Sequence, residues 1–157
     1  MLSADIEKNI AGLRNQNKEV RAISMENLAG LGRSVVPALL SLLDDDNWVI
    51  RYRASEALGI IQDESTIESL IRMTTDNKDH VRYMAVKALA GMQDLRVGPV
   101  LIRMLSDDHS YTRKIAAKGL ANAGKPDAIE HLEKALDCES DPMVRLSFED
   151  ALNRLKK

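Results

Sequence analysis

Three histidines and one cysteine are the residues of this chain best suited to bind a metal ion or to act as a nucleophile. A metal site needs ligands that converge, such as two histidines four residues apart on one helix. His80, His109 and His131 instead occupy different positions relative to the repeats described below. Cys138 lies between two acidic residues, whereas a reactive thiolate needs a positively charged neighbourhood. We therefore predict no metal site, no cofactor and no catalytic residue, and favour a protein that is not an enzyme.

Five regularly spaced arginines could form a row that recognises phosphate, because a guanidinium binds oxyanions through two hydrogen bonds. They are Arg21, Arg51, Arg82, Arg113 and Arg145, which lie 30, 31, 31 and 32 residues apart. Each falls in the first turns of a predicted helix, where the helix dipole disfavours a cation, and a polar, mostly acidic turn precedes it. We therefore predict that these arginines pair with acidic turns and tie one repeat to the next.

The spacing of the arginines indicates a helical repeat, since a fixed period of this size is typical of solenoids. Counted from each arginine, positions −1, +3, +6, +7 and +10 share one face of a helix. Position +7 is leucine in every copy: Leu28, Leu58, Leu89, Leu120 and Leu152. Positions +3 and +6 are mostly small, which lets stacked helices approach closely. Ser24 and Asn27 depart from this pattern in the first copy, and Phe148 departs from it in the fifth.

A second apolar helix is predicted before each of these helices, at about 6–13, 35–43, 67–73, 97–105 and 128–136. The links inside each pair are polar and rich in Asp and Asn, which cap helix N-termini. The links between pairs carry glycine or another turn signal. We therefore predict an all-α protein, a right-handed α-solenoid of about five helix pairs. It would form a single domain over 1–157, with repeats at about 1–32, 33–62, 63–93, 94–124 and 125–157.

The pattern V/I-R-x-x-A-x-x-A-L after an Asp-rich turn, as in Val81-Arg82 to Leu89, resembles HEAT-like repeats. It is most similar to the short repeats of the phycobilisome-lyase type. The resemblance implies an armadillo-like fold in which the second helices line the concave side. It says little about activity, because the family includes scaffolds, lyase subunits and metal-dependent hydroxylases. The hydroxylases carry His-Glu dipeptides, and this sequence has none.

The composition of the chain indicates which kinds of partner and which cellular compartment to expect. The chain has 22 basic and 24 acidic residues, a net charge of −2, which does not favour nucleic acid or membrane as a partner. No apolar run approaches the roughly 18 residues of a membrane span, and no signal peptide is visible. A single cysteine suits a reducing cytoplasm. We expect a cytoplasmic protein whose polar first and last repeats cap a complete array.

A ridge opposite the core face is the predicted binding surface. Positions +1 and +5 of the second helices read Ala22/Glu26, Tyr52/Glu56, Tyr83/Lys87, Lys114/Lys118 and Leu146/Asp150. The predicted binding residues among them are Tyr52, Glu56, Tyr83, Lys87, Lys114, Lys118 and Glu26. Exposed tyrosines serve interfaces well, because they offer apolar area and a hydroxyl at low entropy cost. The alternative is a solvated ridge whose tyrosines pack against neighbouring repeats. Trp48 is expected to pack over the junction between repeats 1 and 2.

The sequence thus favours a protein–protein interaction scaffold that binds an unidentified protein on its concave face. Two alternatives stay open. The resemblance implies a possible subunit of a bilin lyase-like enzyme. A local basic patch suggests weak binding to a nucleic-acid backbone; its residues are Lys87, Lys114, Lys118, Arg113 and Arg53. Glu26, Glu56 and Asp150 on the same ridge would repel phosphate. The chain would be a monomer, or a dimer through the C-terminal repeat, where Phe148 is a large apolar residue near the end.

Overall fold

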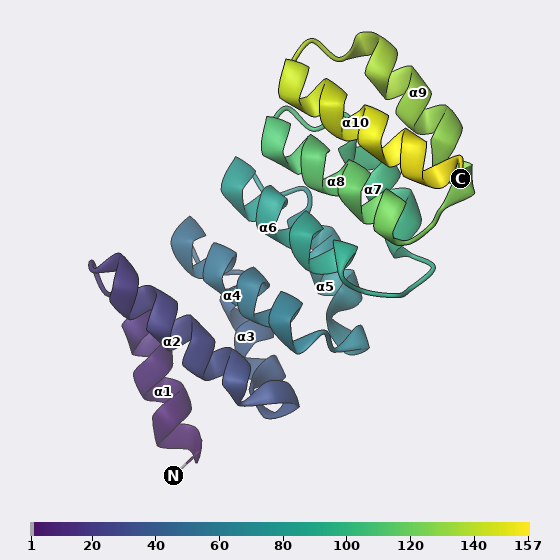
Figure 1. Cartoon of the computed structure of the whole chain (residues 1–157). Coiled ribbons are helices and arrows are strands. Elements are labelled where there is room, and N and C mark those ends of the chain that lie inside the picture. Colours follow the sequence, from purple (N-terminus) through teal and green to yellow (C-terminus); the bar gives the residue numbers. More distant parts are fainter. Residues whose placement is uncertain (1) are drawn as a thin grey trace.

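The computed structural model describes residues 2–157, which form ten α-helices in five pairs and contain no β-strand (Figure 1). The first helices of the pairs are α1 (Leu2–Leu13), α3 (Val36–Leu42), α5 (Ile67–Met73), α7 (Val97–Met104) and α9 (Ile129–Cys138). The second helices are α2 (Lys18–Gly30), α4 (Trp48–Ile61), α6 (Asp79–Ala90), α8 (Ser110–Asn122) and α10 (Pro142–Leu155). Short 3₁₀ turns at Gly32–Val35, Glu64–Thr66 and Pro126–Ala128 lead into α3, α5 and α9. The predicted all-α solenoid of five helix pairs is confirmed.

The helices form two layers, and the layer of second helices is the more closely packed. In sequence order α2, α4, α6, α8 and α10 each contact the next one extensively, whereas the first helices contact one another much less. Figure 1 shows the second helices side by side in front of the first helices. The second helices thus form one continuous layer, and its outer surface is the one that the resemblance assigns to the concave face.

The core follows the repeat positions that the sequence predicts. The position +7 leucines are fully buried in the four N-terminal repeats and nearly so in the last, at 7% exposure for Leu152. Phe148 is also completely buried, at 0% exposure. The suggestion that Phe148 marks a dimer contact is therefore wrong, because its ring fills the core of the last repeat. In the first repeat Ser24 is buried, while Asn27 is exposed and donates to Asn9 Oδ1 at 3.0 Å.

Small residues set the close approach of the second helices. A Cβ atom on Gly119 of α8 would lie 2.8 Å from Ala90 Cβ and 2.9 Å from Leu101 Cδ1. A Cβ atom on Gly59 of α4 would lie 2.8 Å from Ala88 Cβ of α6. The backbones are therefore too close for a larger side chain at either glycine. The predicted role of the small residues is confirmed at position +6, which Gly119 and Ala88 occupy.

Candidate functional site

The arginine row is structural in its three central members. Arg51, Arg82 and Arg113 each direct Nε at a carboxylate of the next repeat. The acceptors are Asp76 at 2.7 Å, Asp107 at 2.7 Å and Glu139 at 2.6 Å, respectively. In each case Nη1 also donates to a backbone carbonyl of the turn that precedes the arginine's own helix. All three acceptor carboxylates are only 6% exposed. The predicted network between repeats is confirmed here, and these guanidinium groups are not free to bind a ligand.

The two terminal arginines do not follow this arrangement. Arg21 donates to the backbone carbonyls of Asn15 and Gln16, and Asp45, the carboxylate that would complete the row, is bound by Arg14 instead. Arg145 donates to backbone carbonyls only, those of residues 136 and 139. Within residues 2–157, neither forms an ion pair with a neighbouring repeat. The prediction of carboxylate pairing is therefore wrong at both ends of the array.

A groove of about 470 Å³ runs between α6, α8 and α10 on the concave face. Three exposed apolar side chains line it: Tyr111, Met143 and Leu146 are 61%, 58% and 58% exposed. The remaining lining residues are Tyr83, Lys114, Ile115, Lys118, Ser147, Asp150 and Arg154. Large apolar residues are rarely this exposed in one place without a partner. The groove is therefore the most suitable surface for binding on this face.

The structure brings together only the C-terminal half of the predicted ridge. Tyr83, Lys114 and Lys118 line the groove, and Lys87 is exposed on α6 beside them. Glu26 is exposed on α2, several helices away. The predicted residues do not form one continuous groove.

The other two predicted ridge residues have roles inside the fold. Tyr52 is half-buried and packs against the hydrophobic core, and this burial raises the pKa of its hydroxyl. Glu56 Oε2 accepts from Arg53 Nη1 at 2.6 Å, so its charge is compensated within α4. The alternative of tyrosines that lean on neighbouring structure therefore describes Tyr52 well, whereas Tyr83 lies at the groove.

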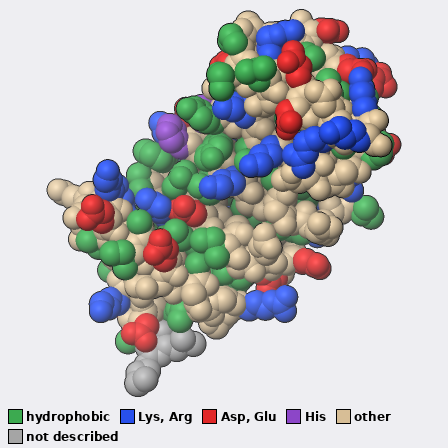
Figure 2. Space-filling model, viewed as in Figure 1, with side chains coloured by type: hydrophobic (Ala, Val, Ile, Leu, Met, Phe, Trp, Pro, Cys, Tyr) green, Lys and Arg blue, Asp and Glu red, His purple; other side chains and the backbone are tan. Residues whose placement is uncertain are grey.

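The basic residues of the groove have their charges available. In the part of the chain that the structure describes, Lys87, Lys114 and Lys118 form no ion pair with a carboxylate. Lys114 Nζ lies 5.3 Å from the centre of the Tyr111 ring, a cation–π contact. Figure 2 shows Lys and Arg side chains in a band across the surface formed by α6 and α8, next to hydrophobic side chains. The groove thus combines apolar area with uncompensated positive charge.

A row of rings continues from the groove along the N-terminal ends of α4, α6 and α8. Its members, in order, are Trp48, His80, His109, Tyr83 and Tyr111, and the ring centres of successive members lie 5.5–6.5 Å apart. The ring contacts of Trp48 are with His80 and Lys78 of repeat 3. These ring contacts lie at the junction of repeats 2 and 3, and the expected packing of Trp48 over the junction of repeats 1 and 2 stays a prediction. His80 and His109 serve here as part of an aromatic surface.

Two other kinds of site are not found in residues 2–157. No three His, Cys, Asp or Glu side chains lie close enough together to hold a metal ion, and none of the helices combines the length and apolarity that a membrane span requires. His80 Nδ1 lies 2.7 Å from Asp79 Oδ1, and this hydrogen bond lowers the pKa of the carboxyl to about 2. Cys138 is exposed.

Comparison with known proteins identifies the family to which this architecture belongs. The model of the HEAT repeat family matches residues 6–90 and 73–153. These matches span nearly the whole chain, so this protein belongs to the HEAT repeat family. The chain matches no curated protein.

Several solved structures share the fold. A chain of the CpcE–CpcF complex of phycocyanin lyase from Nostoc sp. PCC7120 has a TM-score of 0.85 and 24% sequence identity, covering 95% of this chain and 98% of that chain. A designed armadillo repeat protein in complex with the peptide (KR)4 has a TM-score of 0.60 and 18% identity, covering 94% of this chain and 80% of that chain. At these identities the similarity shows the fold alone.

Proposed function

We propose that this protein is a non-enzymatic scaffold that binds an acidic, partly apolar segment of a partner protein in the groove between α6, α8 and α10. The observation that carries the proposal is the combination of exposed Tyr111, Met143 and Leu146 with uncompensated Lys114 and Lys118 in one groove. Apolar anchors supply affinity, and complementary charge supplies orientation and association rate. A segment with carboxylates beside an aliphatic or aromatic residue satisfies both features.

The distribution of charge supports an acidic partner over a basic one. Four cations lie on or beside the groove, Lys87, Lys114, Lys118 and Arg154, against the single carboxylate of Asp150. The acidic residues of the N-terminal half do not extend into the groove, and Glu56 is already paired with Arg53. A basic peptide would therefore meet repulsion at the apolar anchors themselves.

Two of the structurally similar proteins support the general class of function. One was solved as a complex of two proteins, CpcE and CpcF, and another was solved with the peptide (KR)4. That peptide is basic, whereas the groove of this chain carries positive charge. We therefore propose the same general mode, a chain segment held by the repeat surface, with the opposite sign of charge in the bound segment.

Selection from a random peptide library, displayed on phage, tests this function. We expect the wild-type protein to enrich peptides that carry Asp or Glu within a few residues of Leu, Ile, Phe or Trp. The double variant Lys114→Glu/Lys118→Glu should lose this enrichment and select basic peptides, because the variant reverses the charge at the same anchors. The variant Leu146→Ser should bind the selected peptides about tenfold more weakly than the wild type, since it lacks an exposed apolar anchor.

The control is Lys134→Glu, which makes the same charge change on α9 at a lysine that is 70% exposed and pairs with Glu130. It should select the same peptides as the wild type. Enrichment of basic peptides by the wild type, or the same acidic peptides selected by Lys114→Glu/Lys118→Glu, would show that the groove is not the binding surface. Enrichment of no peptide above background would also contradict the proposal.

A further inference from the structure

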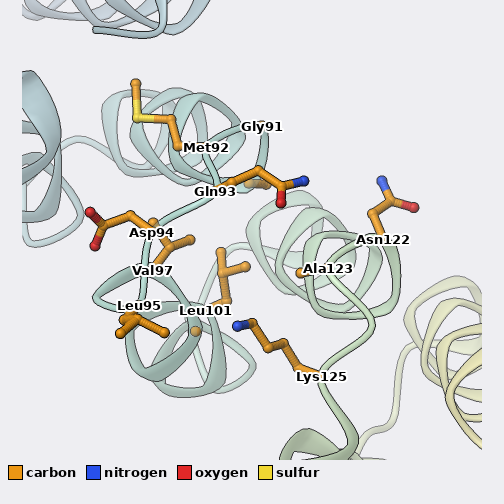
Figure 3. Close-up of a pocket in the computed structure, with 12 residues that line it drawn as sticks. Gly91, Met92, Gln93, Asp94, Leu95, Val97, Leu101, Asn122, Ala123 and Lys125 are labelled. Carbon is orange, nitrogen blue, oxygen red and sulfur yellow. The ribbon is translucent and has the colours of Figure 1, made fainter. Parts of the chain in front are cut away.

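A second cavity, of about 270 Å³, lies at the edge of the solenoid where the C-terminal ends of α6 and α8 meet α7 (Figure 3). Its apolar lining includes Met92, Val97 and Leu101, which are nearly or fully buried. Leu95 lies at the same cavity and is 86% exposed, the highest exposure among the large apolar residues that the structure describes. The cavity is therefore distinct from the groove and offers an apolar interior with an apolar side chain in solvent beside it.

The cavity coincides with a missing side chain. Gly98 of α7 lies 15 residues before Arg113, and the residues 15 before Arg51 and Arg82 are Val36 and Ile67. In repeats 2 and 3 these larger side chains are 6% and 0% exposed and fill the core. At Gly98 an added Cβ would find its nearest atom, Lys125 Cε, at 3.9 Å. Repeat 4 thus has space where its neighbours have an aliphatic side chain.

A second departure from the repeat pattern places a positive charge at the same cavity. Asp63 and Asp94 precede the turns that lead into α5 and α7, and each accepts the N–H two residues later, at 2.9 and 2.8 Å. Lys125 occupies the equivalent position before α9 and makes no such hydrogen bond. Figure 3 shows its side chain extending from the loop toward Leu101, so that the ammonium group ends at the cavity.

The neighbouring carboxylate does not neutralise this lysine. Asp94 also lines the cavity, but it is engaged by Arg96, whose Nε and Nη2 each lie 2.8 Å from its oxygens. These hydrogen bonds lower the pKa of Asp94 to about 2. Lys125 forms no ion pair within the described part of the chain. The cavity therefore keeps one uncompensated cation beside an apolar interior.

Two residues with side-chain amides, Asn122 and Gln93, lie at the cavity, and they are oriented differently. The Asn122 amide is turned away from Lys125 (Figure 3), and its Oδ1 accepts from Arg154 Nη2 of α10 at 2.8 Å. Gln93 also lines the cavity. The volume lies just below the roughly 300 Å³ at which pockets for drug-sized ligands begin, so an occupant must be short.

We propose that this cavity binds a short aliphatic carboxylate. The aliphatic part occupies the space above Gly98 against Val97 and Leu101, and the carboxylate accepts from Lys125 Nζ. A charge-assisted hydrogen bond to a carboxylate is stronger than one between neutral groups, and it orients the ligand. The same chemistry is offered by a free branched-chain acid and by the C-terminal residue of a peptide chain. The proposal does not depend on the function assigned to the groove.

Titration of ¹⁵N-labelled protein, followed by NMR, tests the proposal with isovalerate as the free acid and isovaleramide as its uncharged match. We expect isovalerate to shift the backbone amide signals of Gly98 and Lys125, with weak, millimolar affinity suited to so few atoms. Isovaleramide should produce much smaller shifts. The tripeptide Gly-Gly-Leu with a free C-terminus is then compared with its C-terminal amide.

The tripeptide arm separates the two sources of the carboxylate. Tighter binding of free Gly-Gly-Leu than of isovalerate assigns the cavity to chain termini, and the reverse order assigns it to free acids. Both results support a carboxylate site. Equal binding of the charged and uncharged member of each pair, or no shift from either acid, would overturn the proposal.

Two variants and one control link any binding to the cavity. Lys125→Gln should lower the affinity for isovalerate by about tenfold. Gly98→Ile restores the kind of residue found in repeats 2 and 3, so it should raise the thermal midpoint of unfolding and abolish the shifts. Lys87→Gln, on the concave face, should bind isovalerate as the wild type does. Undiminished binding in Lys125→Gln or in a folded Gly98→Ile protein would overturn the proposal, and a higher midpoint shows that Gly98→Ile is folded.

Discussion

Arg82 joins two consecutive turns of the solenoid. Its Nε donates to Asp107 Oδ2 at 2.7 Å, and its Nη1 donates to the backbone carbonyl of Asp76 at 3.1 Å. The Arg82 and Asp107 side chains are only 17% and 6% exposed. The stability of a solenoid is the sum of its repeats and of the interfaces between neighbours. Contacts of this kind therefore stabilise the interfaces between neighbouring repeats. The planar guanidinium is suited to reach both acceptors at once.

Replacing Arg82 by lysine should destabilise the protein although the charge is kept. The ammonium group of lysine is a single point charge and cannot form the paired hydrogen bonds to Asp107. We expect the free energy of unfolding to fall by about 1–3 kcal/mol, measured by urea denaturation followed by circular dichroism.

The matched control for this variant is Arg72→Lys. Arg72 pairs with Asp44, and these side chains are 51% and 66% exposed. Exposed pairs contribute about 0–1 kcal/mol, so this substitution should change stability little. Equal losses in Arg72→Lys and Arg82→Lys would contradict a special role for the partly buried pair.

The same network predicts how stability depends on pH. Burial alone would raise the pKa of Asp76, but hydrogen bonds from Arg51 and from the Lys78 backbone N–H lower it below the ordinary value of 3.8. The pKa of Glu139 is likewise lowered from 4.5, by Arg113 and backbone N–H groups, against the effect of burial.

A carboxyl with a lowered pKa in the folded state stabilises the fold fully above its unfolded pKa. This stabilisation is lost as the pH falls, because the unfolded chain takes up protons first. We therefore expect the contribution of these two carboxyls to the thermal midpoint of unfolding to stay constant from pH 7 to about pH 5. Below about pH 4 their protonation should lower the midpoint. Scanning calorimetry over this range measures the effect.

The variant Arg51→Gln isolates the contribution of Asp76 to the pH dependence. It removes the side-chain donor that holds the pKa of this carboxyl down. The variant should be less stable than the wild type at neutral pH, and it should lose less additional stability between pH 5 and pH 3. Parallel curves for the two proteins would show that this pair does not determine the acid response.

The sequence predicted well the features that repeat. The leucines at position +7 and the small residues at +3 and +6 face the same surroundings in the three central copies, so one helical period fixes their burial there. The central arginines pair with the next turn for the same reason. The prediction failed for Arg21 and Arg145, whose neighbours at the ends of the array differ from those in the middle.

The candidate site was less predictable because it combines residues from unequal positions. Leu146 lies at position +1, on the predicted ridge, but Tyr111 and Met143 line the groove from two residues before their arginines. His109 contacts the ring of Tyr83 across a turn. Long side chains that lean along the surface decide these contacts, and a repeat alignment carries no such information. The small cavity is harder still to foresee, since a glycine, Gly98, stands where its neighbours have a side chain.

Alanine should have opposite effects on stability at two glycines, because Gly119 lies where α8 approaches α6 closely and Gly30 lies in open space. Gly119→Ala places a Cβ 2.8 Å from Ala90 Cβ and 2.9 Å from Leu101 Cδ1. We expect a loss of about 1–3 kcal/mol in the free energy of unfolding from this overpacking. Gly30→Ala, at the end of α2, has nothing within 4 Å of the new Cβ.

Gly30→Ala should therefore be neutral or stabilising by up to about 1 kcal/mol, because alanine favours a helix. Chemical denaturation of the two variants beside the wild type measures both effects. A Gly119→Ala protein as stable as the Gly30→Ala protein would mean that the two helices can separate without cost.

In the last repeat, one apolar residue should affect stability and another should affect association between copies of the chain. The ring of Phe148 is 0% exposed, whereas Leu146 on the same helix is 58% exposed. Phe148→Leu should lower the free energy of unfolding by about 1–3 kcal/mol, because it leaves a cavity in the core. Leu146→Ser should change stability by no more than about 0.5 kcal/mol.

Light scattering after size-exclusion chromatography shows which side chain matters for association. If copies of the chain associate through the C-terminal repeat, Leu146→Ser should shift the protein toward the monomer and Phe148→Leu should not, as long as the variant is folded. The reason is that a partner can contact only the side chain that reaches the surface. A Phe148→Leu protein of unchanged stability and altered mass would contradict the packing described here, since the ring would then lie outside the core.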